Sequence, residues 1–475
     1  MTAASVALPR RSAWLVLAPL AGAALLISFG LVQQPWLVVG LVGGAIVLTV
    51  AVAAPLALVA LMLILGGLDL SFMTGGFKAL FPGLGGLDMN GIRLLGATAG
   101  FTIYILNAPA ARAAIFRKTG SAYLLFLVYA FLTLSQSMDP MEGTRLLLKL
   151  AYPLLTFLLI IGLCDTRQKV EKLANYALLA GTLLIFIITP LYTLKTGYHV
   201  DFSGVRRLGG LSGGHNQFSF YLVTLLLLAF TRLIYRKQAR YLAMCAAAAF
   251  WILATGTRIS FLAALIGIAM ISVLTAITRK QYKAVAGGML VTLMIIVPGM
   301  PMILERTLGF VPAAGELIGL VSNPVALYEA INWQGRTHLW PVVWAGFMAA
   351  PVFGLGLGSS GAVIARHFPA DAVATVHNEY LRLGADTGMV GIGLFAIAMF
   401  SWLLAALRAA VRAKPEVVEY AMPAAAGVVA WAIIALTDNP FDSYMLFTQY
   451  VGFFMGATLA LQSIAAREQH DKNPG

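Results

Sequence analysis

Long apolar stretches recur along this chain, and they constrain its fold more than any other feature. A transmembrane helix needs about 20 predominantly apolar residues. Only 11% of the 475 residues are charged, against about 25% in a soluble domain. These features predict an all-α polytopic membrane protein and exclude a soluble enzyme, a nucleic-acid-binding domain, a disulfide-rich scaffold and a disordered protein. We predict about fourteen spans, near residues 13–30, 36–53, 54–67, 92–107, 120–136, 146–163, 172–194, 216–235, 240–254, 257–277, 283–303, 386–408, 420–436 and 445–463.

The distribution of Lys and Arg predicts which side of the membrane each connection faces. The formal net charge is +13, and basic residues concentrate in cytoplasmic loops. With the N-terminus placed inside, every second connection is basic, and the inside segments hold 20 Lys and Arg against 6 Asp and Glu. The other side holds 12 against 13. We therefore expect an even number of spans with both termini cytoplasmic, and we interpret the first apolar segment as a retained span rather than a signal peptide.

This topology divides the chain into four parts. Residues 1–194 form an N-terminal bundle with an interfacial or re-entrant segment at 68–91, and residues 195–303 form a transmembrane core with an arginine-bearing external loop. Residues 304–385 form a large external loop, and loops of that length are usually functional. Residues 386–475 form the C-terminal spans and tail. The two cysteines, Cys164 and Cys245, lack metal spacing, and we see no reason to pair them.

Four external sites carry ionisable residues that membrane orientation does not explain. Such residues beside a span are functional candidates by default. Each site also has a structural alternative. In the order in which the sites are named below, these are exposed loop arginines, an interfacial anchor, a structural loop and an ordinary polar histidine. A glycine-rich turn, PVFGLGLGSSG, either packs tightly or lies near a glycan or phosphate. The four sites are Arg206 and Arg207 in GVRRLGGLSGGHN, Arg258 in ATGTRISFLAALIG, Arg336 and His338 in NWQGRTHLWPVVW, and His377 in ATVHNEYLRLG, where Asn378 and Glu379 would orient the histidine or bind hydroxyl groups.

These residue types favour transfer from a diphosphate-activated donor to an alcohol. Several arginines without a metal site suit a diphosphate, both when it binds and when it leaves. A histidine can deprotonate an attacking hydroxyl group. The sequence shows no metal-ligand cluster and no nucleotide-binding loop, so no metal and no cofactor are expected. At an external membrane surface, the donor that fits this chemistry is a polyprenyl-diphosphate-linked sugar.

Several motifs together resemble the O-antigen ligase/polymerase superfamily. The main one runs from Gly335-Arg336, through Gly354-Leu355-Gly356-Leu357-Gly358, to His377-Asn378-Glu379-Tyr380-Leu381 and Gly388-Met389-Val390-Gly391. The segments TGTRISFLAAL and RRLGGLSGGHNQFSFYL resemble two further arginine-bearing elements of the family, in the family's order. The detailed resemblance covers residues of about 200–390.

The resemblance implies a metal-independent, inverting glycosyltransferase of GT-C-like helical architecture in the bacterial inner membrane. Its donor would be an undecaprenyl-diphosphate-linked oligosaccharide on the periplasmic side, where loop 304–385 would lie before the last three spans. By motif, His377 would be the catalytic base, and Arg258 with Arg206 or Arg207 would bind the diphosphate. Arg336 would shape or contact the site. The remaining substrate-binding candidates are His338, Asn378 and Glu379.

Two enzymatic functions and one non-enzymatic function follow as alternatives. A polysaccharide polymerase would join lipid-linked repeat units, with or without a chain-length regulator as partner, and the additional N-terminal spans favour it. An O-antigen ligase would transfer the finished glycan to lipid A–core. The third alternative is a flippase or transporter of lipid-linked oligosaccharide, although the polar residues gather at one membrane face rather than at the midplane. Membrane lipids are expected partners of all three, and nucleic acid of none.

Overall fold

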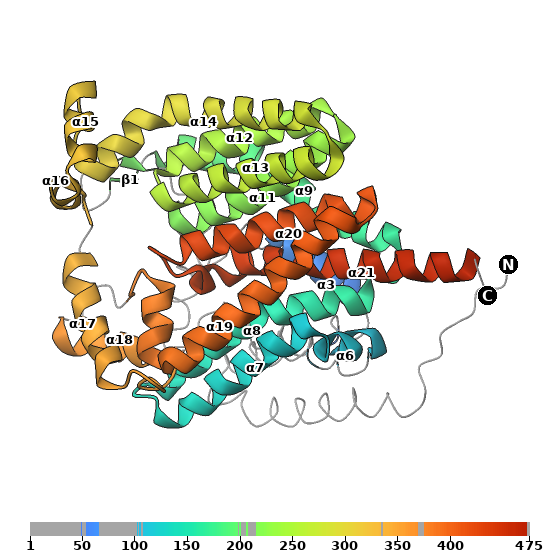
Figure 1. Ribbon diagram of the computed structural model, residues 1–475, viewed down its shortest axis with the longest axis horizontal. Coiled ribbons are helices and arrows are strands. Elements are labelled where there is room, and N and C mark those ends of the chain that lie inside the picture. Colours follow the sequence, from blue (N-terminus) through green and yellow to red (C-terminus); the bar gives the residue numbers. More distant parts are fainter. Residues whose placement is uncertain are drawn as a thin grey trace, which may run out of the picture.

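The computed structural model describes residues 54–65, 108–197, 199–200, 206–207, 215–333, 336–368 and 375–472, with residues 49, 102, 104 and 105. This part of the chain is almost entirely helical (Figure 1). A short antiparallel hairpin, β1 (His199–Val200) paired with β2 (Arg206–Arg207), is an addition to the predicted all-α fold. The predicted spans 13–30, 36–53 and 92–107 and the segment 68–91 lie wholly or almost wholly outside the described residues.

Eight described helical segments are long and apolar enough to cross a membrane. They correspond one by one to eight predicted spans. The predicted spans 54–67 and 240–254 appear as the shorter apolar helices α3 (Pro55–Leu65) and α12 (Ala239–Thr255). The last predicted span corresponds to α21 (Gln449–Lys472), which is not among the eight. The eight are α7 (Lys118–Thr133) with η1 (Leu134–Gln136), α8 (Pro140–Leu163), α9 (Arg167–Leu183) with η2 (Leu184–Ile188) and α10 (Thr189–Thr196), α11 (His215–Arg236), α13 (Arg258–Arg279), α14 (Tyr282–Leu308), α19 (Glu379–Arg412) and α20 (Pro415–Ile434).

Residues predicted to share the basic side of the membrane meet at one end of the bundle. Arg232, which is completely buried, lies 3.1 Å from Glu171 across α9 and α11. Arg236 lies 2.7 Å from both Glu171 and Glu419. Arg167 at the start of α9 pairs with the tail of α21. Because these contacts join connections that are far apart in sequence, they confirm that the connections lie at the same end of the helices.

Close backbone packing joins α8 to α21. A Cβ atom added to Gly452 would lie 2.4 Å from the carbonyl oxygen of Pro153, and one added to Gly456 would lie 2.8 Å from that of Phe157. Glycines four residues apart allow two membrane helices to approach this closely. The C-terminal helix is therefore packed directly against the first part of the bundle.

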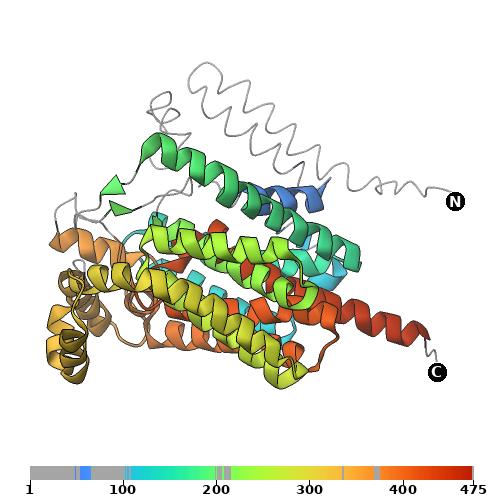
Figure 2. The same ribbon diagram turned by 90° about the horizontal axis from the view of Figure 1, so that it is seen from above.

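The predicted loop 304–385 is largely helical. It holds α15 (Ala314–Ser322), α16 (Pro324–Ala330), α17 (Arg336–Ala349) and α18 (Ser359–His367). These helices and β1 gather at the end of the bundle opposite the basic contacts and the end of α21 (Figures 1 and 2). The chain returns through α19, which begins seven residues before the predicted span because the Asn378 side chain accepts a hydrogen bond from the Leu381 amide at 2.9 Å and caps the helix.

A backbone break at Gly388 divides α19. Its φ of +66° lies in the left-handed region, which favours glycine. A Cβ atom there would lie 2.2 Å from the carbonyl oxygen of Val352. The break therefore lets the segment after α17 pack directly on the backbone of α19.

We predict that Gly388→Ala lowers the free energy of unfolding by more than about 1 kcal/mol, because the change adds both strain and a backbone clash. Thermal unfolding of the purified protein in detergent measures the effect. Gly393→Ala on the same helix is the matched control, since its Cβ would meet nothing within 4 Å. The control should be neutral or slightly stabilising, and equal destabilisation by both variants would contradict the assignment.

Candidate functional site

Residues 435–443, which follow α20 and lead through the π-helix η4 (Tyr444–Thr448) into α21, carry the carboxylate at the centre of the candidate site. The Asn216 side chain, at the start of α11, donates a hydrogen bond of 2.6 Å to Oδ2 of Asp438. Nδ1 of His377 lies 3.5 Å from Oδ1 of the same carboxylate. Asp438 is itself buried. It therefore joins the beginning of α11 to the turn that precedes α19.

His377 occupies a constrained position. Its φ of +51° is unusual for a residue other than glycine, and strained residues of this kind cluster at functional sites. The side chain is 29% exposed. Because Nδ1 faces Asp438, the opposite ring nitrogen, Nε2, points away from the carboxylate. A carboxylate beside one imidazole nitrogen fixes the orientation of the ring and supports proton transfer at the other nitrogen.

A cavity of about 410 Å³ brings three arginines together beside this pair. Arg258 begins α13, Arg306 lies in the last turn of α14, and Arg336 begins α17. Among the described residues, Asp438 is the one carboxylate that lines this cavity, so its described lining carries an excess of positive charge. An arginine cavity of this size suits an anion with several oxygen atoms, such as a diphosphate.

Backbone carbonyl groups orient the three guanidinium groups. Arg258 donates to the carbonyl oxygen of Asn332 at 3.1 Å, and Arg306, only 4% exposed, donates to that of Gly256. Arg336 donates to that of Thr437 at 2.9 Å. Burial lowers the pKa of Arg336 from its ordinary value, and Asp438 acts in the opposite direction. Each of these bonds fixes the direction of one guanidinium group, which has five N–H donors in a planar arrangement.

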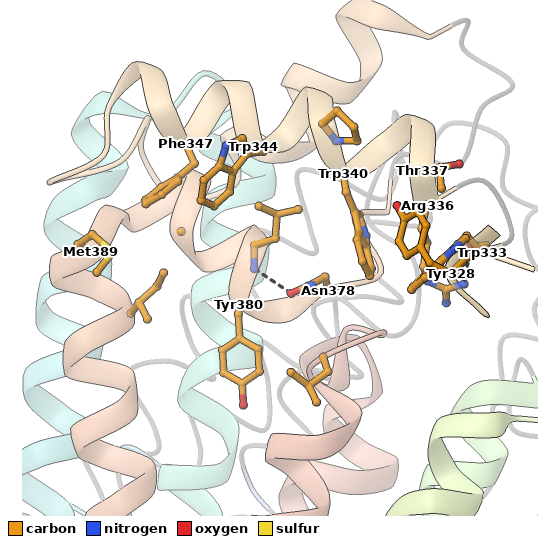
Figure 3. Close-up of a pocket in the computed structure, with 15 residues that line it drawn as sticks. Tyr328, Trp333, Arg336, Thr337, Trp340, Trp344, Phe347, Asn378, Tyr380 and Met389 are labelled. Atoms are coloured by element: carbon orange, nitrogen blue, oxygen red, sulfur yellow. Dashed lines mark hydrogen bonds between the residues drawn. The ribbon is translucent and has the colours of Figure 1, made fainter. Parts of the chain in front are cut away.

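An apolar groove of about 720 Å³ adjoins the arginine cavity and shares Trp333 and Arg336 with it. Figure 3 shows Trp340, Trp344 and Phe347 of α17 along the groove, with Met389 of α19 at the end away from Arg336. Trp344 is 54% exposed and Met389 58%. An open apolar surface next to a cationic cavity suits an amphiphilic ligand.

The glycine-rich turn between α17 and α18 packs tightly. A Cβ atom on Gly356 would lie 2.3 Å from the Ser137 amide nitrogen, and one on Gly358 would lie 2.4 Å from that of Gly143. The buried carboxylate of Asp386 accepts hydrogen bonds from the amides of Gly358 and Ser360. Of the two predicted roles for this turn, the structure supports close packing, which attaches α18 to the bundle.

The structure brings some of the predicted site residues together. Arg258 and Arg336 line one cavity, and His377 contacts the carboxylate that lines it. Asn378 lines the apolar groove, whereas Glu379 is fully buried and binds Arg382 at 2.7 Å. His338 is exposed on α17 and is not among the lining residues of the cavity or groove. Arg206 and Arg207 form β2, and their side chains lie outside the described part of the structure.

Three further site residues were not predicted from the sequence: Asn216, Arg306 and Asp438. For each of them, the sequence contains a feature that could have identified it as a candidate. Arg306 ends an apolar run on the side that has fewer Lys and Arg, Asn216 begins a predicted span, and Asp438 lies in the short polar sequence TDNPFDS between two spans. Among the described residues, no group of three or more His, Cys, Asp or Glu side chains converges as a metal site requires.

Comparison with known families gives a match over the central part of the chain. The family model described as O-Antigen ligase matches residues 243–396. The match confirms the resemblance to the O-antigen ligase/polymerase superfamily, whose members are glycosyltransferase-like ligases and polymerases. A comparison with curated proteins gives no match. With eight apolar helices, the match supports a multi-pass membrane enzyme of this superfamily type.

We predict that inorganic pyrophosphate binds the arginine cavity and that Arg258→Ala weakens this binding by at least about tenfold, the value expected when a charge-assisted hydrogen bond is lost. Calorimetric titration of the purified protein measures the affinity, which should fall as salt is added. Arg366→Ala, at an exposed position on α18 away from the cavity, is the control. Equal losses in both variants would leave Arg258 as an interfacial anchor.

Proposed function

We propose that this protein is a metal-independent, inverting glycosyltransferase that acts as a polysaccharide polymerase at the periplasmic face of the inner membrane. It transfers oligosaccharide from undecaprenyl diphosphate to a hydroxyl group of an acceptor glycan. One observation carries the proposal: a histidine–aspartate pair lies beside a cavity of three arginines, and an apolar groove leads away from that cavity.

The reaction proceeds by direct displacement at the anomeric carbon of the donor sugar. Nε2 of His377 accepts the proton of the acceptor hydroxyl group, and the oxygen attacks the anomeric carbon from the face opposite the diphosphate. The bond between that carbon and the diphosphate oxygen breaks as the new glycosidic bond forms, which inverts the configuration. The electron pair remains on the lipid diphosphate, and the histidine later releases its proton to water.

The surrounding residues stabilise the charges that develop during this step. Asp438 stabilises the imidazolium ion that His377 becomes. Arg258, Arg306 and Arg336 stabilise the leaving diphosphate through charge-assisted hydrogen bonds in a partly buried cavity. No proton needs to be delivered to the leaving group, because a diphosphate already leaves as a stable anion.

The apolar groove provides a place for the isoprenoid chain of the donor. Its open side is lined by Trp344 and Met389, which allows a chain to continue into the surrounding lipid. Because Arg336 lines both the groove and the cavity, the first isoprene units and the diphosphate would contact the same residue from two sides. This arrangement suits a lipid-borne donor better than a soluble nucleotide sugar.

The charge distribution supports a periplasmic site. The basic connections meet at the opposite end of the bundle, and basic connections face the cytoplasm. The tail of α21 lies at that basic end, where Glu468 pairs with Arg167, so we place the C-terminus in the cytoplasm. The predicted even number of spans would place the N-terminus on the same side. A site at one end of the bundle also favours an enzyme over a transporter, whose binding site would lie near the midplane.

We predict that His377→Asn lowers glycan transfer by about 10²–10⁴-fold, the range expected for loss of a general base. Asparagine tolerates the left-handed backbone at this position, so folding and binding of undecaprenyl diphosphate should persist. Transfer is measured with the purified protein in nanodiscs and a lipid-diphosphate-linked oligosaccharide. His338→Asn on the exposed face of α17 is the control, and full activity of His377→Asn would reject the histidine as the base.

The product profile distinguishes the polymerase from the ligase. We expect the purified protein, given its lipid-linked repeat unit alone, to produce a ladder of longer lipid-linked glycans on a gel. A single transfer that requires added lipid A–core would identify a ligase instead. A ladder of undiminished yield in His377→Asn would reject the histidine as the base of the polymerase reaction.

A further inference from the structure

A second polar cavity lies on the other side of the 435–443 connection. It encloses about 480 Å³ and is lined by residues of α8, α18 and the beginning of α19. Asp442 stands at its centre and binds Lys149 at 2.9 Å and Arg382 at 3.0 Å. Burial opposes ionisation of Asp442, but Arg382 and Lys149 outweigh it and hold the pKa of this carboxyl well below its usual range.

The charge of this cavity contrasts with that of the arginine cavity. The described part of its lining carries two basic side chains, Lys149 and Arg382, and three acidic ones, Asp139, Glu142 and Asp442. The basic groups are already paired with Asp442, so a second diphosphate is a poor occupant. Paired acids and bases still offer both hydrogen-bond donors and acceptors, which is what a ring of sugar hydroxyl groups requires.

Asn439 supplies the observation that points to a ligand. The residue is only 2% exposed and lines the polar cavity, and among the described residues neither its side-chain oxygen nor its side-chain nitrogen has a hydrogen-bond partner. Buried polar groups are almost always paired, so an unpaired amide facing a cavity calls for an explanation. An amide offers a donor and an acceptor side by side, which matches adjacent hydroxyl groups of a sugar.

The polar cavity is well placed for the attacking group. Val376, which directly precedes His377, lines it, and so does Asn439, which directly follows Asp438. The two preceding residues of the same connection, Thr437 and Asp438, line the arginine cavity. The histidine–aspartate pair therefore lies where the two cavities approach each other.

We propose that the polar cavity is the acceptor subsite and that it takes an uncharged, hydroxyl-rich sugar ring, with the Asn439 amide bound to its hydroxyl groups. This inference rests on the proposed function, in which the arginine cavity holds the donor diphosphate. On α18, Gly361, Ala362 and Ala365 line the cavity and leave room for the ring. The acceptor hydroxyl then reaches Nε2 of His377 from the side opposite the leaving group.

The test uses a pair of substitutions on one helix. Ala365 is exposed and lines the cavity, whereas the neighbouring Arg366 is exposed and does not. Ala365→Trp should fill the cavity, and Arg366→Trp places the same ring outside it. The probes are the methyl glycosides of glucose, galactose, mannose and rhamnose, measured by saturation-transfer NMR on the full-length protein in nanodiscs, with inorganic pyrophosphate as the donor-side probe.

We expect at least one glycoside to bind the wild-type protein saturably and Ala365→Trp to weaken that binding by at least about tenfold. Asn439→Leu should weaken it to a similar extent, because the hydroxyl groups lose their partner, and Asn439→Gln, which keeps the amide, should restore part of it. Pyrophosphate binding should be unchanged in all of these variants. Arg366→Trp should affect neither probe.

Several results would overturn the inference. They are the absence of saturable glycoside binding to the wild-type protein, equal weakening by Arg366→Trp, and loss of pyrophosphate rather than glycoside binding in Ala365→Trp. The last result would assign the cavity to the donor. A wild-type protein that binds glycoside and pyrophosphate in this pattern but transfers no glycan would reject the proposed function while leaving the sugar site in place.

Discussion

The candidate site depends on a short polar connection held at one end of an apolar bundle. Residues 435–443 receive hydrogen bonds or ion pairs from four other parts of the chain. Asp438 contacts Asn216 and His377, Thr437 accepts from Arg336, and Asp442 binds Lys149 and Arg382. Because α20 and α21 fix both ends of this connection, its carboxylates cannot move far, and the groups that bind them are held in position.

The two ends of the bundle use charge for different purposes. At the basic end, Arg232 and Arg236 are neutralised by Glu171 and Glu419, so their contacts hold α9, α11 and α20 together. At the other end, the arginine cavity keeps an excess of positive charge in its lining. A buried structural arginine without an acidic partner would destabilise the fold. A binding site for an anion, by contrast, requires an excess of positive charge. The number of acidic side chains near an arginine therefore distinguishes the structural arginines at the basic end from the candidate binding arginines in the cavity.

Much of the fold was predictable from the sequence, because helix length and hydrophobicity are local properties. Eight predicted spans appear as helices of spanning length, and the alternation of basic connections correctly grouped residues such as Arg232 and Glu419 at one end. The short helices at 314–322, 324–330 and 359–367 inside 304–385 were not predicted. Residues 314–330 and 359–367 form short helices whose positions depend on caps and on tight glycine contacts, and neither produces a long apolar pattern.

The site was only partly predictable, for a related reason. Arg258, Arg336 and His377 stood out because each is an ionisable residue beside an apolar run. Asn216 is not ionisable, and the position of Asp438 after a predicted span does not show which residues it contacts. Their role emerges only when the start of α11 and the end of α20 are placed side by side. Glu379 looked like a partner of His377 from its position two residues later, but the turn into α19 directs its side chain towards Arg382 instead.

The family match covers the arginines and the histidine of the candidate site but only part of the polar cavity. Residues 243–396 include Arg258, Arg306, Arg336 and His377, the residues that would bind the diphosphate and take the proton. Lys149, Asn439 and Asp442, which line the polar cavity, lie outside the match. Members of the superfamily include ligases and polymerases, which differ in the acceptor rather than in the displacement step. On the proposed function, the matched segment holds the arginines and the base of the common reaction, whereas Asp438 and Asn216 lie outside it. The lining of the polar cavity is divided between the matched segment, which holds Val376 and Arg382, and the flanking segments. On the proposed function, the difference between a ligase and a polymerase belongs to the polar cavity, and residues 435–443 are the part of the chain that connects it to the shared chemistry.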